Sequence, residues 1–239
     1  MADIQPYMRD GYTKEFHTTV KSIADGKFVT LNETYFYPTS GGQPHDTGVL
    51  KTADGREVKV IFVGLFGEQP SHQVEPEGVL KVGDEVTGTI DWDRRYTHMR
   101  MHTAAHLVSK VFEDKKGAVV TGNQLGLDKS RIDYELDDYN PDELRAFEDV
   151  VNEFIEQSLD VTSHVVSREE AEELLDRLST LKMGFPEHIT QVRLVQIGDI
   201  DMQACGGTHL ANTKEAGKVK FLKFDNKGKN NRRVYFTVE

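Results

Sequence analysis

Two pairs of candidate metal ligands, far apart in the chain, constrain the fold more than any other feature of the sequence. The single cysteine, Cys205, stands four positions before His209, and the two glycines between them favour a tight turn. A second pair, His102 and His106, lies in a different segment. Thiolate and imidazole are both ligands of zinc. If one ion takes both pairs, the fold must bring these segments together.

The segment from Met99 to Phe112 is rich in good helix formers. Its two histidines are four positions apart, so their side chains share one helix face, a single turn apart. Thr103 stands where the His-Glu-x-x-His motif of metalloproteases carries a glutamate as general base. The sequence therefore disfavours a metalloprotease.

Each pair alone has a plain explanation. A histidine pair at this spacing is often a packing or surface coincidence, and a lone cysteine is usually a small buried hydrophobic residue. Together the pairs supply a complete tetrahedral set, which predicts one Zn²⁺ per chain, bound by His102, His106, Cys205 and His209. The spacing fits equally a closed structural site and a site in which water or substrate displaces one ligand.

Composition bounds the class of protein. A chain of 239 residues is long enough for one large domain or two compact ones without disulfides. One cysteine permits no internal disulfide, which fits a reducing compartment. The N-terminal residues lack the pattern of a secretory signal, and no apolar run is long enough to span a membrane. We therefore expect a soluble, cytoplasmic protein without a membrane partner.

The net charge of −11 argues against DNA or another nucleic acid as a partner, because phosphate binding relies on lysine and arginine. The segment from Lys214 to Arg233 is the exception, with eight basic residues against two acidic ones. Because binding faces are local, this segment could contact phosphates. A solvated pair of strands with a charged hairpin loop explains it as well.

Residues 1–90 are expected to form a β-rich domain. Short apolar segments bounded by glycine or aspartate predict strands at 17–23, 28–31, from 49, 58–63 and 86–90. Such regularly spaced strands favour a small barrel. Within this region the pair Gly41-Gly42 predicts a tight turn or a close backbone approach. The composition changes between residues 88 and 94, where we place the domain boundary.

Residues 91–239 predict an α+β domain with helices on a largely antiparallel sheet. Asn140 and Pro141 suit the start of an amphipathic helix, and Ser167 with Glu170 has the spacing of a capping box that opens another helix, through about Leu178. Predicted strands cover residues 130–136, 161–166, 190–197, 219–224 and 234–238.

Three motifs carry a family likeness: His102-Thr-Ala-Ala-His106, Cys205-Gly-Gly-Thr-His209 and the glycine motif Ser40-Gly-Gly-Gln-Pro-His-Asp-Thr-Gly48. In combination they resemble the editing domain of alanyl-tRNA synthetases and the free-standing AlaX proteins that edit in trans. The likeness covers nearly the whole chain. Without a preceding aminoacylation domain or a long C-terminal extension, the chain resembles the medium-sized AlaX form, and no aminoacylation activity is expected.

The resemblance implies a zinc-dependent deacylase that hydrolyses serine or glycine wrongly attached to tRNA(Ala), with the acceptor end of that tRNA as partner. It implies zinc at the four positions named above. It also implies that a glutamine, matched here by Gln124, helps to recognise the amino acid. Gly41 and Gly42 correspond to a motif implicated in acceptor-stem recognition or in shaping the pocket.

The chemistry leaves two alternatives open. No acidic residue adjoins the histidines in sequence as an obvious general base, which favours substrate positioning together with a water activated by zinc or by the substrate. The same residues would suit a zinc hydrolase of another acyl substrate. They would also suit a non-catalytic RNA-binding module in which zinc stabilises the fold.

Overall fold

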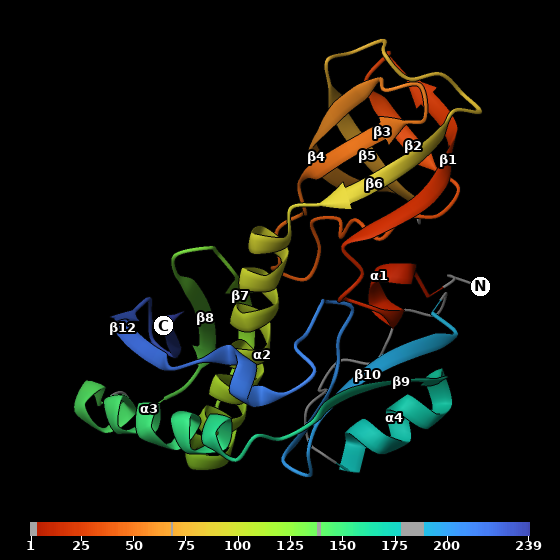
Figure 1. The fold of residues 1–239 in the computed structure, drawn as a ribbon. Coiled ribbons are helices and arrows are strands. Elements are labelled where there is room, and N and C mark those ends of the chain that lie inside the picture. The colour runs from red at the N-terminus through yellow and green to blue at the C-terminus, as the bar shows by residue number, and fades with distance from the viewer. Residues whose placement is uncertain (1–3, 68, 138–139, 178–188) are drawn as a thin grey trace. The chain divides into compact units, whose positions relative to one another are not determined.

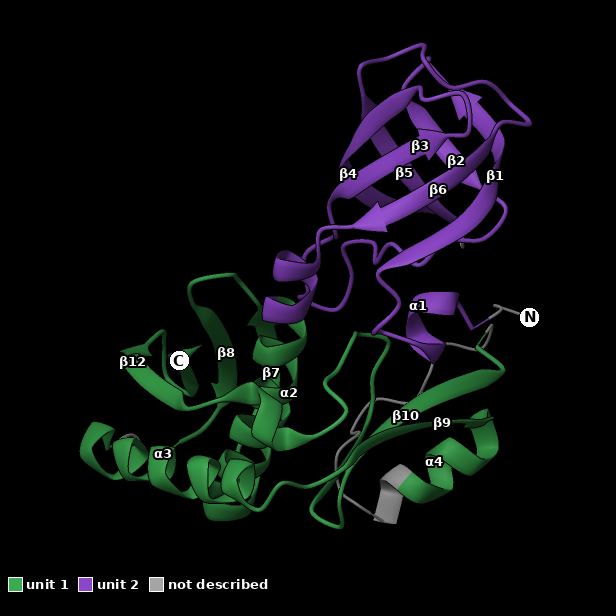
Figure 2. Cartoon of the chain, viewed as in Figure 1, with its two compact units in different colours: residues 1–2, 98–239 green, residues 3–97 purple. Residues whose placement is uncertain are grey.

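The computed structural model describes residues 4–67, 69–137, 140–177 and 189–239. The chain divides into two compact units, shown in separate colours in Figure 2. In chain order, residues 3–97 are called the first unit (purple, unit 2 in the key of Figure 2) and residues 98–239 the second unit (green, unit 1 in the key). The long helix α2 (Trp92–Lys116) contains the point of division. Each unit has its own sheets, so each is described separately.

The first unit is a closed barrel of six antiparallel strands, in the order β1-β2-β5-β4-β3-β6 (Figure 1). Its elements are α1 (Pro6–Arg9), β1 (Glu15–Ala24), β2 (Phe28–Leu31), β3 (Gly48–Thr52), β4 (Glu57–Phe66), β5 (Gln69–Glu75) and β6 (Glu85–Ile90). Alternate side chains of the strands fill the interior, as in Val58 and Val60 of β4. The predicted small barrel is confirmed.

One barrel strand, β5, is absent from the sequence-based prediction. Its residues Gln69 to Glu75 include a proline and only one apolar β-branched residue, Val74. His72 occupies a core position because its Nδ1 lies 2.9 Å from the carbonyl oxygen of Val29 and its Nε2 lies 2.9 Å from Oγ1 of Thr34. A polar residue whose ring nitrogens are both bonded can be buried where a pattern search expects an apolar one.

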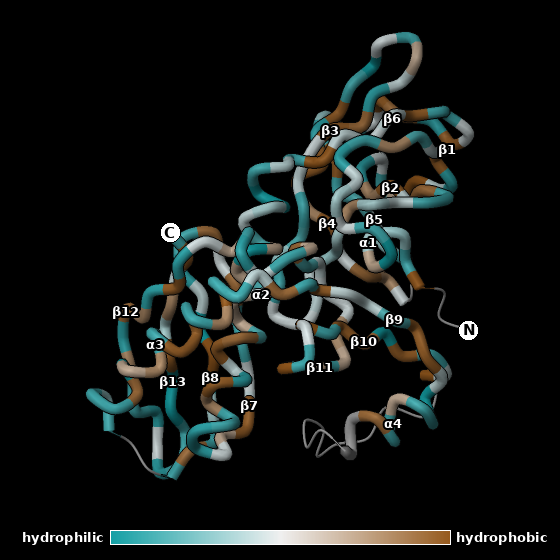
Figure 3. Tube along the Cα trace, turned by 60° about the horizontal axis from the view of Figure 1, so that its bottom comes forward, coloured by the Kyte–Doolittle hydropathy of each residue, from teal (hydrophilic) through white to brown (hydrophobic). Residues whose placement is uncertain are grey.

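The described residues of the second unit form two antiparallel sheets rather than the one expected. The three-stranded sheet has the order β11-β10-β9 and the four-stranded sheet the order β12-β13-β8-β7 (Figure 3). Its elements are β7 (Val119–Gln124), β8 (Ser130–Glu135), α3 (Pro141–Glu156), β9 (Val161–Ser167), α4 (Arg168–Arg177), β10 (Gln191–Ile197), β11 (Asp201–Ala204), the 3-10 helix η1 (Thr213–Ala216), β12 (Val219–Asn226) and β13 (Asn231–Val238). The predicted α+β class with antiparallel sheets is confirmed.

Helix α3 begins as its sequence predicts. The Asn140 side chain accepts hydrogen bonds from the backbone N–H groups of Asp142 and Glu143. The apolar face of the helix is directed inward, with Leu144, Phe147, Val151 and Ile155 buried. At α4, Ser167 Oγ accepts from the backbone N–H of Glu170, as one half of a capping box requires. The predicted end of α4 at Leu178 lies outside the described residues.

Helix α2 packs against the buried face of the four-stranded sheet. The rings of Phe112 and Tyr134 stack with centroids 4.7 Å apart, and the Tyr134 hydroxyl reaches Ser109 Oγ at 3.5 Å. Tyr134 and Ile132 of β8 are fully buried. This contact fixes the helix that carries the histidine pair.

Candidate metal centre

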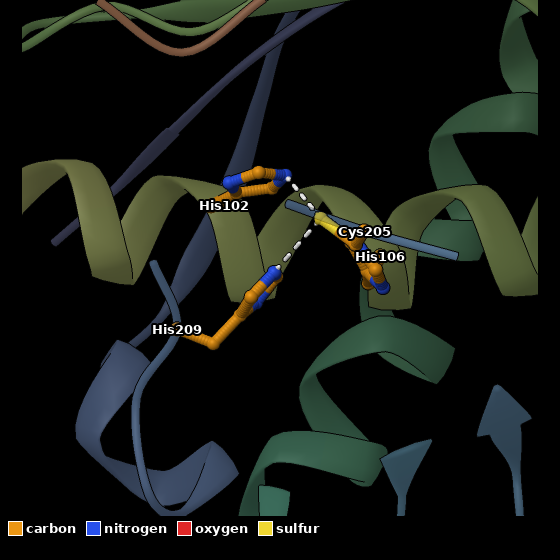
Figure 4. Close-up of side chains that lie close together, drawn as sticks. All are labelled: His102, His106, Cys205 and His209. Atoms are coloured by element: carbon orange, nitrogen blue, oxygen red, sulfur yellow. Dashed lines mark hydrogen bonds between the residues drawn. The ribbon is translucent and has the colours of Figure 1, made fainter. Parts of the chain in front are cut away.

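Two histidines on one helix meet a cysteine and a histidine from a distant loop (Figure 4). His102 and His106 project from one face of α2, one turn apart, and Cys205 and His209 belong to the loop that follows β11. The ligand atoms of all four residues lie within 4.8 Å of one another. The sulfur of Cys205 is 3.4 Å from Nε2 of His102 and 3.3 Å from Nε2 of His209.

The donor set fits a metal ion. A tetrahedral zinc ion with bonds of about 2.0–2.3 Å holds its ligand atoms roughly 3.3–3.8 Å apart. Both sulfur-to-nitrogen distances of Cys205 are close to this spacing. The three histidines are buried, and Cys205 is partly buried, so the site excludes most water. Three imidazoles and one thiolate are a combination that zinc favours over hard cations such as magnesium.

Strand β10 holds the cysteine loop in place through Arg193. The guanidinium Nη1 of Arg193 donates to the carbonyl oxygens of Cys205 at 2.7 Å and of Gly207 at 3.0 Å. The Gly207 N–H in turn points to the cysteine sulfur at 3.4 Å. The backbone N–H of Cys205 donates to the carbonyl oxygen of Arg193. These contacts hold the backbone of the cysteine loop and orient the sulfur of Cys205.

Two further side chains orient the imidazoles. Asp201 Oδ2 lies 3.2 Å from Nδ1 of His106, and Thr103 Oγ1 lies 3.2 Å from Nδ1 of His209. Thr103 also accepts from the backbone N–H of Leu210, which places its hydroxyl. In both histidines Nδ1 is engaged, so Nε2 is left to face the cluster. A carboxylate on the far nitrogen of a histidine is a common support of metal sites.

Charge within the cluster shifts the pKa values of its members. Burial disfavours the imidazolium of His106, but hydrogen bonds to Asp201 and Cys205 outweigh it and raise the pKa of His106 to about 10. Burial also disfavours a thiolate, yet the charges of His102 and His209 hold the pKa of Cys205 well below its usual value. Burial holds the pKa of His209 well below its usual value. The metal-free site therefore favours a thiolate beside an imidazolium.

Sequence reasoning missed the supporting residues Asp201, Thr103 and Arg193. The sequence shows no acidic residue next to the histidines, whereas the structure brings Asp201 to His106 from 95 positions away. The position of Asp201, shortly before Cys205, is the one feature of the sequence that could have indicated its role, because ligand histidines commonly have a carboxylate partner. Nothing in the spacing distinguishes it from the neighbouring Asp199.

Comparison with known proteins identifies the family. The chain is 51% identical over 238 residues to the alanyl-tRNA editing protein AlaX-M of Methanosarcina mazei, covering 97% of this chain and 95% of that protein. The chain belongs to the AlaX-M family. The AlaX-M protein of Saccharolobus solfataricus is 40% identical over 235 residues, with 98% of both chains covered. The alanine–tRNA ligase of Pyrococcus abyssi is 40% identical over 220 residues, which span 91% of this chain and 24% of the ligase.

Two synthetase families match separate parts of this AlaX-M chain. Residues 7–94 match the family described as tRNA synthetases class II (A). Residues 192–235 match the family described as the threonyl and alanyl tRNA synthetase second additional domain. The second match includes Cys205 and His209. None of the described helices of the AlaX-M chain combines the length and apolar character needed to cross a membrane.

The glycine motif of this AlaX-M chain forms a tight turn in the first unit. Gly41 and Gly42 have φ angles of 55° and 85°, in the left-handed region that favours glycine. Ser40 and Gln43 exchange backbone hydrogen bonds of 3.1 and 2.8 Å across them. The turn confirms the local structure that the glycine pair predicts, while a contact with tRNA stays a prediction.

A buried ion pair fixes the base of this glycine loop. Arg95, at the start of α2, donates through Nε to both carboxylate oxygens of Asp46 at 3.1 and 3.0 Å, and both side chains are fully buried. The same guanidinium donates to the carbonyl oxygens of Gly11 and Tyr35. Asp46 also accepts from the backbone N–H of Tyr37. One ion pair thus ties the loop to the helix and the N-terminal segment.

Gln124 lies at the end of β7 and is exposed. Its Oε1 accepts a hydrogen bond of 3.1 Å from Nε of Arg131 on the neighbouring strand. Gln124 is paired with Arg131 across the two strands, so both side chains lie on the same face of the sheet. This face is the one that does not pack on α2, because the next residue of β8, Ile132, points to the opposite face and is buried. The structure therefore brings together the four predicted metal ligands and gives Gln124 a partner outside that cluster. A role for Gln124 in amino-acid recognition stays a prediction.

Proposed function

We propose that this chain is a trans-editing aminoacyl-tRNA deacylase that hydrolyses the ester of Ser-tRNA(Ala), and secondarily of Gly-tRNA(Ala), with zinc as its metal and without aminoacylation activity. The observation that carries the proposal is the cluster of His102, His106, Cys205 and His209 in a chain whose relatives are named alanyl-tRNA editing proteins. A cytoplasmic location, where charged tRNA is used, belongs to the same proposal.

The residues of the chain suit ester hydrolysis by positioning. Bound zinc would supply Lewis acidity toward an ester carbonyl, or a positive charge that orients the amino and hydroxyl groups of the substrate. Asp201 keeps His106 aligned, and it also accepts hydrogen bonds from Gln203 at 3.0 and 3.2 Å. Because its oxygens are engaged in this way, Asp201 is a positioning residue rather than a general base.

Selectivity requires a polar partner for the serine hydroxyl. A site that hydrogen-bonds this hydroxyl leaves its own polar group unpaired when alanine binds, and that cost disfavours alanine. We propose Gln124 as the partner, on the resemblance of its sequence context to the family. Gly41 and Gly42 are proposed to contact the acceptor stem, since residues without side chains allow a backbone to approach a phosphate closely.

The test is deacylation of purified Ser-tRNA(Ala), Gly-tRNA(Ala) and Ala-tRNA(Ala) by the parent protein, a chelator-treated sample and two variants. His106→Ala removes a proposed ligand. His164→Ala is the matched control, because His164 is an exposed histidine on β9 of the same unit. We expect release of serine and glycine, with alanine spared, by the parent and by His164→Ala. The chelated sample and His106→Ala should be inactive while circular dichroism shows a folded chain.

The alternatives give different results. A zinc hydrolase of another acyl substrate would bind zinc and leave all three aminoacyl-tRNAs intact. An RNA-binding module with structural zinc would also leave them intact, and it would unfold when the metal is removed. Either result would contradict the proposed editing activity.

A further inference from the structure

The four-stranded sheet of the second unit has one buried and one solvent-facing side. On β13, Val234 and Phe236 are fully buried, while Arg233 and Tyr235, which alternate with them, are only half-buried. On β8, Ile132 and Tyr134 are buried against α2, and Arg131 and Asp133 alternate with them. The second set of side chains defines the outer face of the sheet, opposite the helix that carries His102.

Strand register places an aromatic ring among cations on this outer face. Tyr235 is paired with Lys223 of β12 on one side and with Arg131 of β8 on the other. Arg131 is in turn paired with Gln124 of β7. The four strands, adjacent in Figure 3, thus contribute one row of outward side chains centred on Tyr235. Cations also approach the ring from Lys129, at 5.8 Å, and from Arg233, at 5.9 Å.

A hollow of about 390 Å³ opens beside the ring. Its lining includes Gln124, Lys129, Arg131, Arg233 and Tyr235. The Lys129 ammonium lies near the outer limit of a cation–π contact, about 6 Å, so this contact is weak. A planar group such as a nucleic-acid base could therefore take the place of the Lys129 ammonium over the Tyr235 ring. The ammonium could then contact an anion such as a phosphate.

Two carboxylates on the outer face, Asp133 and Asp225, are each shared between two cations and do not neutralise both. Asp133 contacts both Arg131, at 2.6 Å, and Arg233, at 2.6 Å. Asp225 contacts both Lys223, at 2.6 Å, and Lys227, at 3.3 Å. With Lys129, this cluster has excess positive charge on a chain whose net charge is −11. A positive cluster around an aromatic ring complements phosphates that flank a base.

We infer that this outer face binds RNA, with a base stacked on Tyr235 and phosphates beside Lys129, Lys223 and the two arginines. Stacking on an aromatic side chain accepts any base, and flanking cations follow the backbone. The inference deepens the proposed function and rests on it for the identity of the RNA, which is tRNA. Because the sheet separates this face from α2, the contact serves affinity for the tRNA body and leaves the reacting ester to the metal site.

The test measures binding of an uncharged tRNA(Ala) transcript to the full chain by filter binding at two salt concentrations. Tyr235→Leu removes the ring and keeps an apolar side chain. The double variant Lys129→Gln with Lys223→Gln removes two charges. Tyr235→Phe keeps the ring, and Lys115→Gln is the matched control, since Lys115 is an exposed lysine on α2 of the same unit. Thermal unfolding of each variant establishes that the sheet is intact.

We expect Tyr235→Leu to weaken binding about tenfold, the loss of one stacked base, and Tyr235→Phe to bind like the parent. The double lysine variant should bind more weakly and with a flatter dependence on salt, while Lys115→Gln changes little. On Ser-tRNA(Ala), Tyr235→Leu should raise KM and leave kcat unchanged. Parental affinity in the folded Tyr235→Leu and double lysine variants, or a parent that does not bind tRNA, would overturn the inference. A parent that binds tRNA through this face without deacylating it would contradict the proposed function alone.

Discussion

The Nδ1 atom of His106 lies 3.2 Å from Oδ2 of Asp201, which stands four residues before Cys205 in the chain. The contact links the two halves of the metal cluster without involving a ligand atom. The carboxylate is nearly fully buried, with 1% of its side chain exposed, and the histidine side chain has 7% exposed. Such a pair holds the imidazole ring in the orientation that presents Nε2 to the metal.

Asp201→Asn should weaken zinc binding by about 10- to 100-fold, the usual cost of losing a carboxylate partner of a ligand histidine. The substitution keeps the shape of the side chain and removes its charge, so the fold should persist. Zinc affinity is measured by competition with a chromophoric chelator. Asp199→Asn is the control, because Asp199 is exposed and close by in sequence. Equal affinities of the two variants would contradict a role for Asp201.

Zinc affinity should rise with pH by about tenfold per unit between pH 6.5 and 8.5. The pKa of His106 is raised to about 10, whereas that of Cys205 is lowered well below its usual value. The raised pKa keeps a proton on His106 over this range, and binding of the metal must release it. The lowered pKa of Cys205 reduces the competition between a thiol proton and the metal. Competition titrations at pH 6.5, 7.5 and 8.5 check the slope. An affinity independent of pH would show that His106 is already neutral.

The stability of the metal-free chain follows from the same two groups. A raised pKa of His106 stabilises the fold below about pH 6.5 and loses this effect as pH rises toward 10. The pKa of Cys205 is lowered from a value near 9 in the unfolded chain. The thiolate therefore stabilises the fold above about pH 9, and this stabilisation is lost as pH falls. Between pH 6.5 and 9 the stabilising effect of His106 falls as pH rises, while that of Cys205 grows, so the two effects offset each other. These two groups should therefore leave the free energy of unfolding nearly constant across that range, as urea titrations would show.

Arg95→Leu should lower the free energy of unfolding by about 3–5 kcal/mol, because it leaves the buried carboxylate of Asp46 without its cation. The Tyr35 and Gly11 carbonyl oxygens lose a donor as well. Urea unfolding measures the change. Arg9→Leu, at an exposed arginine of the same unit, should change it by less than about 0.5 kcal/mol. A loss of similar size in both variants would mean that the Asp46 ion pair contributes little.

The elements with strong local signals could be predicted from the sequence. The barrel strands alternate apolar and polar residues, and α3 begins at Asn140 because its side chain caps the helix. The four metal ligands could be grouped before their contact was known, because two incomplete donor pairs together form one complete set.

The rest depends on contacts that leave no local signal. Strand β5 carries a buried histidine, whose bonds to Thr34 and Val29 come from other parts of the barrel. Asp201 and Arg193 act on the cluster through contacts that only the folded sheet creates. The two sheets of the second unit could not be separated by periodicity, since strands of both alternate alike.

Gln124→Ala separates two roles for one side chain. If Gln124 recognises the serine hydroxyl, the variant should lose at least about tenfold of the selectivity for Ser-tRNA(Ala) over Ala-tRNA(Ala), because the site no longer offers a polar group that alanine leaves unpaired. Its Oε1 is 3.1 Å from Nε of Arg131, so this role requires the aminoacyl group to reach the outer face or the amide to leave that contact.

The competing result has a distinct signature. Gln124 could instead contribute to RNA binding at the outer face, by holding Arg131 beside the hollow next to Tyr235. In that case the variant should keep its selectivity and bind uncharged tRNA more weakly. Rates of deacylation of the two aminoacyl-tRNAs, measured beside filter binding of the transcript, distinguish these outcomes. Asn123→Ala, an exposed neighbour on the same strand, is the control for general effects on β7. Unchanged selectivity with weakened tRNA binding would show that Gln124 contributes to RNA binding and not to amino-acid recognition.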